Sequence, residues 1–349
     1  MLLTICLAIY KRVAPFRYTF EALLKQIEGL DSVEIVVSVN PSEDGNHDLI
    51  DYVTEKHRHF EFKLFINEKN IGGEANINNA VKNASGKFVW IIGDDDLVLP
   101  SSVNRVLGIL KTYPDVTWIF MNTARVSGKI EEESHNLIVP KVADLQEGYY
   151  ANGIECALKT HKLVDAAMLF SSSNVYLRES MLVINASQED ADDCNQLASA
   201  FNSASRGAAF LIDTPCILAG GARTWTDRED FFLGMHYNRD ILYAVNYGID
   251  IKQAKDLIAY RMRHDALRSW FSIFKMIFHR NKLGLVAYKE LFRLIPIETI
   301  LCTVFSPFIA VYLLCRHKIR NKKRMRICKE YLHNSQAIKE IKDRIPYYE

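Results

Sequence analysis

The first third of the chain alternates between apolar runs and segments with helical periodicity, and this alternation restricts the fold most strongly. Residues 3–10 form a near-continuous apolar run, which is typical of a strand covered on both faces. A segment that opens at Pro15 and ends at Gly29 then places its apolar residues at helical spacing. Strands that alternate with helices of this length predict an α/β protein with a doubly wound, mostly parallel sheet.

The same periodicities predict further elements along the chain. Strands are expected at 34–40, 62–67, 87–92 and 116–121, and helices at 47–57, from Gly72 through Val81, and at 100–113. The middle of the chain is less regular, with a strand predicted over 166–177, a helical piece at 197–201 and a strand at 208–212. From Phe232 onward the pattern is helical, so a helical carboxyl-terminal extension is expected.

Charge and cysteine content exclude several classes of protein. The net charge is +1, and no basic patch interleaved with aromatic residues occurs in the first 250 residues, so no nucleic-acid partner is expected. The seven cysteines form no CxxC pair, which indicates neither a zinc site nor a disulfide framework and fits a reducing compartment. The amino-terminal apolar run is short and is followed by Lys11 and Arg12, so a secretory signal is not predicted.

The strand predicted at 87–92 leads directly into three consecutive carboxylates, Asp94, Asp95 and Asp96. Adjacent carboxylates repel one another and are costly to desolvate unless a cation neutralises them. Such a cluster at the carboxyl end of a strand suits a hard divalent ion that holds a phosphate-bearing ligand. A simpler interpretation is that Asp95 or Asp96 caps the helix near Pro100. The triplet alone does not decide between them.

Polar and glycine-rich segments also follow the strands ahead of this triplet. The first strand ends in Ile9, Tyr10 and Arg12, the second in Asn40 followed by Asp44, and Gly72 and Asn76 open the next helix. Each has a plain structural explanation: an aromatic residue covering the sheet, a turn aspartate, and an asparagine near a helix cap. In a parallel sheet, however, the carboxyl ends of neighbouring strands lie at one edge, where ligands bind.

The order and spacing of these segments resemble the family-2 glycosyltransferases of the GT-A fold. The subgroup that the sequence resembles acts in bacterial O-antigen and capsule assembly and includes enzymes of the abequosyltransferase type. The resemblance covers about residues 1–125 and is thin beyond them. It implies an inverting glycosyltransferase that moves a sugar from a nucleotide-sugar donor to a glycan acceptor, lipid-linked in our interpretation.

The resemblance also implies roles for individual residues. Donor-binding roles fall on Ile9, Tyr10, Arg12, Asn40, Asp44, Gly72, Asn76, Asp94 and Asp95. Asp94 and Asp96 would hold Mg²⁺ or Mn²⁺, which suits oxygen ligands. The catalytic base would be Asp190, with Asp192 and Asp193 as rivals, although acidic residues also gather at helix amino termini for electrostatic reasons alone. Ser171 to Asn174 are expected to line the acceptor side or to lie on an edge strand.

Two departures from the family pattern leave alternatives open. Val39 stands where the family usually has an aspartate that contacts the base, and only Arg223 and Trp225 remain of a Gln-x-x-Arg-Trp motif, which argues against a processive synthase. A catalytically silent scaffold with the same fold is one alternative. A sugar nucleotidyltransferase is another, disfavoured because no glycine-rich loop follows the first strand.

A change of character near the carboxyl terminus suggests a membrane surface as a partner. Residues 297–315 carry Glu298 as their only charge, and the strongly basic segment 316–326 follows. An interfacial helix, a single span and a buried core helix all fit this pattern. The expected organisation is a nucleotide-sugar-binding half at 1–125, an acceptor and catalytic-base half at 126–230, and a helical region at 231–349. About residues 295–326 of that region would associate with the cytoplasmic face of the inner membrane.

Overall fold

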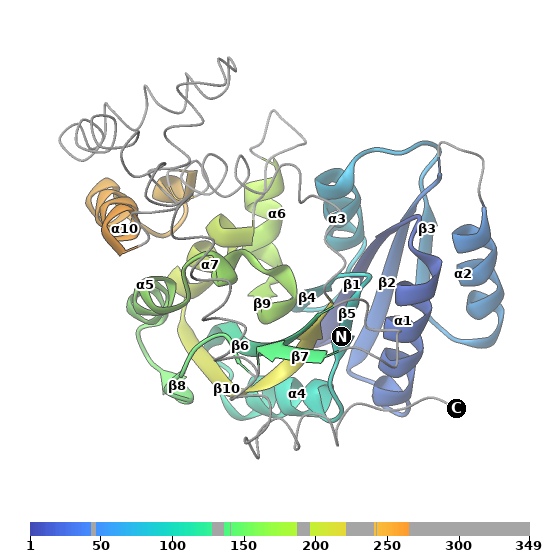
Figure 1. Cartoon of the computed structure of the whole chain (residues 1–349), viewed down its shortest axis with the longest axis horizontal. Coiled ribbons are helices and arrows are strands. Elements are labelled where there is room, and N and C mark those ends of the chain that lie inside the picture. The colour runs from blue at the N-terminus through green and yellow to red at the C-terminus, as the bar shows by residue number, and fades with distance from the viewer. Residues whose placement is uncertain are drawn as a thin grey trace.

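The computed structural model of the chain describes residues 1–42, 47–127, 136–139, 141–186, 196–220, 241 and 243–264 (Figure 1). The strands are β1 (Leu3–Tyr10), β2 (Val33–Asn40), β3 (Lys63–Ile66), β4 (Phe88–Ile92), β5 (Asp96–Val98), β6 (Val116–Ser127), β7 (Asn136–Val139), β8 (Gly148–Tyr150), β9 (Asn174–Leu177) and β10 (Ala208–Ala219). The helices are α1 (Val13–Ile27), α2 (Asp48–His59), α3 (Gly73–Lys82), α4 (Ser102–Thr112), α5 (Gly153–Val164), α6 (Arg178–Ala186), α7 (Gln196–Ser205) and α10 (Ile251–His264). Short 3₁₀ helices are η1 (Asp165–Leu169), η2 (Ser171–Ser173) and η5 (Ala244–Asn246).

The described strands form one sheet in the order β3-β2-β1-β4-β9-β6-β10-β5, with β7 beside β6 and β8 beside β10. In the amino-terminal half, β1 pairs in parallel with both β2 and β4, and β2 pairs in parallel with β3. Tyr10 lies opposite Asn40 in this register. The carboxyl ends of β1 and β2 therefore lie side by side, at the edge that carries the acid triplet.

The second half of the sheet is mixed. β9 runs antiparallel between β4 and β6, and β5 runs antiparallel beside β10, whereas β6 and β10 are parallel. The predicted α/β class with a mostly parallel sheet is confirmed. The sequence did not predict the short strand β5 or the antiparallel direction of β9. Because β6 runs through residue 125 and pairs with β9 and β10, the two predicted halves of the transferase region share one continuous sheet.

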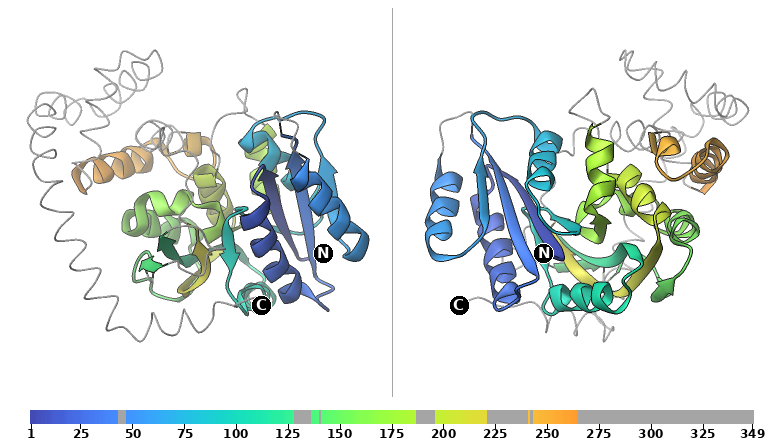
Figure 2. Two further views of the ribbon diagram at one scale, coloured as in Figure 1. Left: turned by 45° about the vertical axis from the view of Figure 1, so that its right-hand side comes forward. Right: turned by 180° about the vertical axis from the view of Figure 1, so that it is seen from behind.

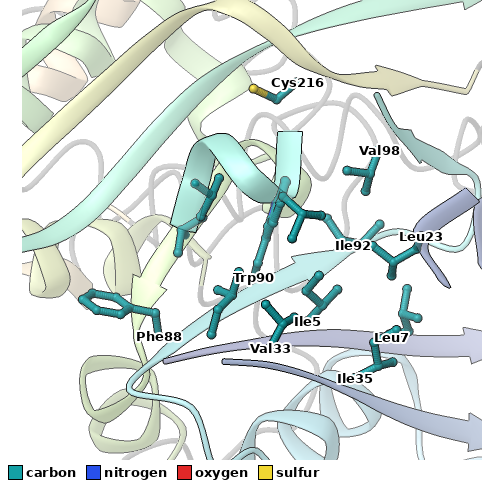
Figure 3. Packing of buried hydrophobic residues seen from close by; sticks show 14 of the residues in the cluster. Ile5, Leu7, Leu23, Val33, Ile35, Phe88, Trp90, Ile92, Val98 and Cys216 are labelled. Carbon is teal, nitrogen blue, oxygen red and sulfur yellow. The ribbon is translucent and has the colours of Figure 1, made fainter. Parts of the chain in front are cut away.

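Both faces of the sheet are covered, as the apolar strands require (Figures 1 and 2). Along β4, Trp90 and Ile92 belong to a core cluster that includes residues of α1, α2 and α4. The alternate residue Ile91 belongs to a cluster with residues of α3, α5, α6 and α7. Figure 3 shows part of the first cluster, in which Trp90 lies opposite Ile5 of β1. The period-two alternation thus places helices on both faces, as a doubly wound sheet requires.

The strand predicted over 166–177 is correct only at its end. Residues 165–173 form η1 and η2, and extended structure begins at Asn174. The Asn174 amide donates to the carbonyl oxygens of Met168 at 3.1 Å and Phe170 at 2.9 Å. Such side-chain bonds to backbone carbonyls stabilise turns and compete with the hydrogen bonds of a strand. The polar residues at the centre of this segment therefore favour short 3₁₀ helices over a strand.

The other predicted elements in this region differ mainly in length. The predicted helical piece at 197–201 is part of α7, and β10 extends beyond 212 to Ala219, with a register shift between Ile212 and Ile217. Helix α5 was not predicted. No helix in the described part of the chain has the length and apolar character needed to cross a bilayer. The predicted membrane-associating segment, about 295–326, lies outside that part.

Candidate active site at the carboxyl ends of β1, β2 and β4

The acid triplet lies in the tight connection between β4 and β5. After the buried strand, the chain turns at Gly93, and the amide of Asp96 donates to the carbonyl oxygen of Gly93 at 3.2 Å. Asp96 then begins β5 and lies opposite Ala219 of β10. Asp94 and Asp96 are buried, and Asp95 is half-buried. Two of the three carboxylates are therefore removed from water and depend on partners within the protein.

Arg12 brings its guanidinium to this triplet from the end of β1. Its Nε donates to Asp94 Oδ2 at 3.0 Å, and its Nη2 bonds to Asp94 Oδ1, so the contact with Asp94 is a two-pronged fork. Its Nη1 donates to Asp95 Oδ2 at 2.7 Å. Forked guanidinium–carboxylate pairs are among the stronger charge-assisted hydrogen bonds. Arg12 thus neutralises part of the charge of the triplet.

The backbone before Arg12 is strained, and the strain fixes where Arg12 lies. Lys11 has φ +63°, a left-handed conformation that is uncommon for a residue with a side chain. The Arg12 amide donates to the Tyr10 carbonyl at 2.8 Å, and the Val13 amide donates to the Lys11 carbonyl at 3.1 Å. This turn ends β1 and begins α1 within three residues, which places Arg12 directly over the connection after β4.

Ser172 of η2 holds the third carboxylate. Its Oγ donates to Asp96 Oδ2 at 2.7 Å and accepts from the Gly93 amide at 3.0 Å. The Ser172 carbonyl in turn accepts from the indole Nε1 of Trp90 at 2.9 Å. A Cβ on Gly93 would lie 2.5 Å from Asp96 Oδ2, so the carboxylate can fold back over this turn only because residue 93 is glycine.

The electrostatics of the triplet favour an added cation. Burial, followed by the charge of Asp95, raises the pKa of Asp96 to about 7, although the hydrogen bond from Ser172 acts in the opposite direction. Burial also raises the pKa of Asp94 to about 6, and the charge of Arg12 opposes this rise. For Arg12, burial lowers the pKa, but Asp94 and Asp95 outweigh it and the pKa is raised. The charge of Arg12 therefore does not offset the effect of burial on the pKa of Asp94 and Asp96.

Asn76 connects three elements at the same edge of the sheet. Its Nδ2 donates to the carbonyl oxygens of Ile9 at 3.3 Å and Ser38 at 3.1 Å. Its Oδ1 accepts from Ser38 Oγ at 2.7 Å and from Asn67 Nδ2 at 2.9 Å. All four hydrogen-bonding positions of this buried amide are used. The described contacts of Asn76 therefore fix the start of α3 against the ends of β1 and β2.

Other asparagines extend this network. The Asn40 amide donates to the Gly72 carbonyl at 3.1 Å, and its oxygen accepts from Asn67 Nδ2 at 3.0 Å. Asn79 Nδ2 donates to Asn67 Oδ1 at 3.0 Å and to Ser38 Oγ at 3.1 Å. Gly72 has φ +88°, which favours glycine, and this conformation lets the loop before α3 approach Asn40. This network brings together four of the residues predicted to bind the donor: Ile9, Asn40, Gly72 and Asn76.

The remaining predicted site residues fall into two groups. Tyr10 is half-buried at the end of β1, with Lys11 Nζ 5.1 Å from its ring centroid. Asp44, Asp190, Asp192 and Asp193 lie outside the described residues, as do Arg223 and Trp225. The sequence interpretation did not identify Ser38, Asn67 and Asn79, and it placed Ser172 either on the acceptor side or on an edge strand. The spacing of Asn76 and Asn79 along one face of α3, with Asn83 directly after the helix, is a signal that would have indicated the network.

The residues of the triplet fit a divalent cation. Within the described part of the chain, no group of three or more histidine, cysteine or acidic side chains surrounds one metal position. Mg²⁺ and similar hard ions, however, are commonly held by one or two carboxylates together with water and substrate phosphates. Asp94 and Asp96 offer such oxygen ligands. The ion pair between Arg12 and Asp94 shows that this position already binds a positively charged group.

Comparison with known proteins finds a similarity over part of the chain. The family model described as Glycosyl transferase family 2 matches residues 4–163. Abequosyltransferase RfbV of Salmonella typhimurium is 33% identical over 115 residues, which are 33% of this chain and 33% of that protein. The chain thus matches about a third of the length of this curated relative. Residues 4–163 are thus similar to the glycosyl transferase family 2, in agreement with the resemblance seen in the sequence.

Solved structures show the same fold. Residues 1–349 of S. aureus TarS superpose with a TM-score of 0.62 at 15% identity, over 100% of this chain and 93% of that one. The mannosyltransferase PcManGT from Pyrobaculum calidifontis, in complex with GDP-Man and Mn²⁺, gives a TM-score of 0.51 at 14% identity, over 89% and 86% of the two chains. These similarities establish a GT-A fold for this chain.

Proposed function

We propose that this chain is an inverting, metal-dependent glycosyltransferase that moves a sugar from a nucleotide-sugar donor to a hydroxyl group of a glycan acceptor. The observation that carries the proposal is the acid triplet after β4, which lies within the family match and next to Arg12 at the end of β1. Open α/β sheets bind their ligands at the carboxyl ends of the strands, which is where these groups meet.

The donor side of the proposed site is built from the edge formed by β1, β2 and α3. Tyr10 offers an aromatic face beside the strand ends, and Asn40 and Asn76 hold the Gly72 loop in place. Arg12 supplies a forked positive charge suited to phosphate groups. Asp94 and Asp96 would hold Mg²⁺ or Mn²⁺, and the bound ion would stabilise negative charge on the departing nucleoside diphosphate.

The acceptor hydroxyl requires a general base, for which we propose Asp190, with Asp192 and Asp193 as rivals. The support for this assignment is the resemblance and the distance along the chain from the acid triplet. In the full chain, Asp190→Asn is expected to abolish turnover and keep donor binding, because a base acts on the acceptor. Unchanged turnover would move the role to Asp192 or Asp193, which the matching asparagine variants would test.

A thermal-shift screen tests the donor part of the proposal. Solved relatives of the fold contain UDP, UDP-GlcNAc or GDP-Man with Mn²⁺, so UDP, GDP, dTDP and CDP are the probes, each with and without Mn²⁺. A diphosphate at 100 times its Kd should stabilise the protein by about 2.7 kcal/mol. We expect a shift that requires Mn²⁺ and is lost in Asp96→Asn. No shift with any of the four would contradict the enzyme and favour a silent scaffold.

We further propose a lipid-linked glycan acceptor in surface polysaccharide synthesis, at the cytoplasmic face of the inner membrane. The support is the name of the curated relative, an abequosyltransferase, and the apolar segment 297–315 with the basic segment 316–326 behind it. The full chain is expected to sediment with vesicles that contain anionic phospholipid. Neutralising Lys322, Lys323 and Arg324 to glutamine should weaken this binding. Equal binding to neutral vesicles would contradict the electrostatic part.

Transfer itself is tested with a membrane lipid extract as acceptor and the diphosphate sugars selected by the thermal-shift screen. Radiolabelled sugar should pass into the organic phase only when both enzyme and Mn²⁺ are present. Transfer to water alone, or to soluble glycans but not to lipid, would contradict a lipid-linked acceptor and leave the donor assignment standing.

A further inference from the structure

We propose that Arg12 is an exchangeable internal cation: it holds Asp94 and Asp95 when the site is empty, releases Asp94 to the incoming metal ion, and turns its guanidinium to the diphosphate of the donor. The inference rests on the proposed function, since it names the order in which charges are exchanged at that site. The carrying observation is the fork between Arg12 and both carboxylate oxygens of Asp94.

The first argument is competition for the same atoms. Arg12 contacts Oδ1 and Oδ2 of Asp94 and Oδ2 of Asp95. A metal ion bound at Asp94 would need an oxygen that already accepts a hydrogen bond from the guanidinium. It would also lie close to the positive charge of Arg12, which repels it. The fork and a metal ion at Asp94 therefore oppose each other.

The second argument is that Asp96 is not part of this competition. Its Oδ2 is held by Ser172 at 2.7 Å, and its backbone is fixed by pairing with Ala219. Asp96 can thus receive a cation at its Oδ1 before Asp94 is released. Asp94 is thus paired to a guanidinium, whereas Asp96 is oriented by a hydroxyl group.

The third argument is that Arg12 is placed to move. Its side chain is 28% exposed, whereas that of Asp94 is 7% exposed, so Arg12 is the more exposed partner of the pair. Arg12 also precedes the first residue of α1, and its backbone amide is tied within the local turn. Turning the side chain therefore requires no change in the backbone of the turn. Its fork matches a phosphate as well as a carboxylate.

The competing explanation is that Arg12 holds Asp94 and Asp95 permanently, as a structural clamp. Mn²⁺ binding in the absence of nucleotide distinguishes this clamp from the proposed exchange. The full chain is titrated with Mn²⁺ while the free ion is followed by electron paramagnetic resonance. If Arg12 must be displaced, Arg12→Gln should bind Mn²⁺ about tenfold tighter than the wild type, because both a competitor and a repelling charge are gone. Lys11→Gln is the matched control, since it removes the same charge one residue away; its effect should stay within about twofold.

The second readout is the coupling between metal and nucleotide, measured by calorimetry with whichever of UDP, GDP, dTDP and CDP binds the wild type. In the wild type, Mn²⁺ and the diphosphate should each strengthen binding of the other by the same factor. In Arg12→Gln, this factor should fall by about tenfold, because the freed guanidinium no longer contacts the phosphates. Arg12→Lys keeps the charge but loses the fork, so its Mn²⁺ affinity should fall between the other two.

Mn²⁺ affinity that is unchanged or weaker in a folded Arg12→Gln would overturn the exchange and establish a clamp. If Arg12→Gln does not fold, Arg12→Lys decides, and Mn²⁺ affinity no higher than that of the wild type has the same meaning. Failure of the proposed function is distinguishable, because the wild type would then bind none of the four diphosphates with Mn²⁺.

Discussion

The hydroxyl group of Ser172 donates a 2.7 Å hydrogen bond to Asp96 Oδ2, which joins η2 to the acid turn after β4. The same oxygen of Ser172 accepts from the Gly93 amide at 3.0 Å. The orientation of the carboxylate proposed to bind metal is therefore set by a residue far from it in the sequence. Ser172 is a positioning residue in this arrangement, because its own contacts are with the protein.

Replacing Ser172 by alanine should leave Asp96 Oδ2 and the Gly93 amide without this partner. Unsatisfied buried groups cost about 1–3 kcal/mol each, so we expect a loss of stability of roughly 2 kcal/mol. The loss of the oriented hydroxyl should also weaken Mn²⁺ binding by about tenfold. Urea denaturation and Mn²⁺ titration measure the two effects. The neighbouring Ser171→Ala is the control, and equal metal binding in both variants would contradict the positioning role.

The raised pKa of Asp96 predicts how stability depends on pH. Burial, with Asp95, raises this pKa to about 7 from an ordinary value of 3.8. A group whose pKa is raised by folding contributes stability that is fully present below its unfolded value, and this contribution is lost as pH rises through the folded value. Metal-free wild type should therefore lose stability relative to Asp96→Asn between pH 5 and pH 8, by on the order of 2 kcal/mol.

Urea denaturation at both pH values, with a chelator present, measures this difference. The exposed Asp31→Asn is the control and should keep a constant difference from the wild type. A constant difference for Asp96→Asn as well would mean that Asp96 is ionised in the folded protein throughout this range. Adding Mn²⁺ at pH 8 should restore stability to the wild type and not to Asp96→Asn, because the ion needs the carboxylate.

The amino-terminal half of the fold is predictable from the sequence, because local hydrophobic patterns define its strands and helices. β1 to β4 and the helices between them are visible because buried parallel strands are apolar runs and the helices have one apolar face. The position of the triplet at the end of β4 follows from the same pattern. The closeness of β1 and β4 follows from the topology of a doubly wound sheet.

Contacts between distant segments are not visible in the same way. β5 and β9 are short, and pairing partners rather than their own residues define them as strands. The bond between Ser172 and Asp96 joins residues of η2 and β5 that no sequence periodicity relates. The fork between Arg12 and Asp94 depends on the left-handed backbone at Lys11, which a lysine does not signal.

The saturated amide of Asn76 predicts a large loss of stability on substitution. Asn76→Ala removes the donors to the Ile9 and Ser38 carbonyls and should cost roughly 3 kcal/mol. Asn76→Asp should cost more, because a carboxylate oxygen would face those same carbonyl oxygens. Asn78 lies on the same helix and has no side-chain hydrogen bond within the described residues. Asn78→Ala should change stability by less than about 0.5 kcal/mol, and a similar cost for both positions would contradict the network.

Substitution of Gly93 tests whether the position of the Asp96 carboxylate determines Mn²⁺ binding, apart from any effect on folding. In Gly93→Ala, the new Cβ would lie 2.5 Å from Asp96 Oδ2 and 3.1 Å from its Cγ, so the carboxylate must leave the position that Ser172 holds. We expect Mn²⁺ to bind about tenfold more weakly. Gly108 lies within α4, and a Cβ added there would meet no atom within 4 Å, so Gly108→Ala should stabilise the protein by about 0.5–1 kcal/mol through helix propensity. Mn²⁺ binding should be unchanged in this control. If Gly93→Ala keeps full Mn²⁺ affinity, the folded-back position of Asp96 is not the one that binds metal.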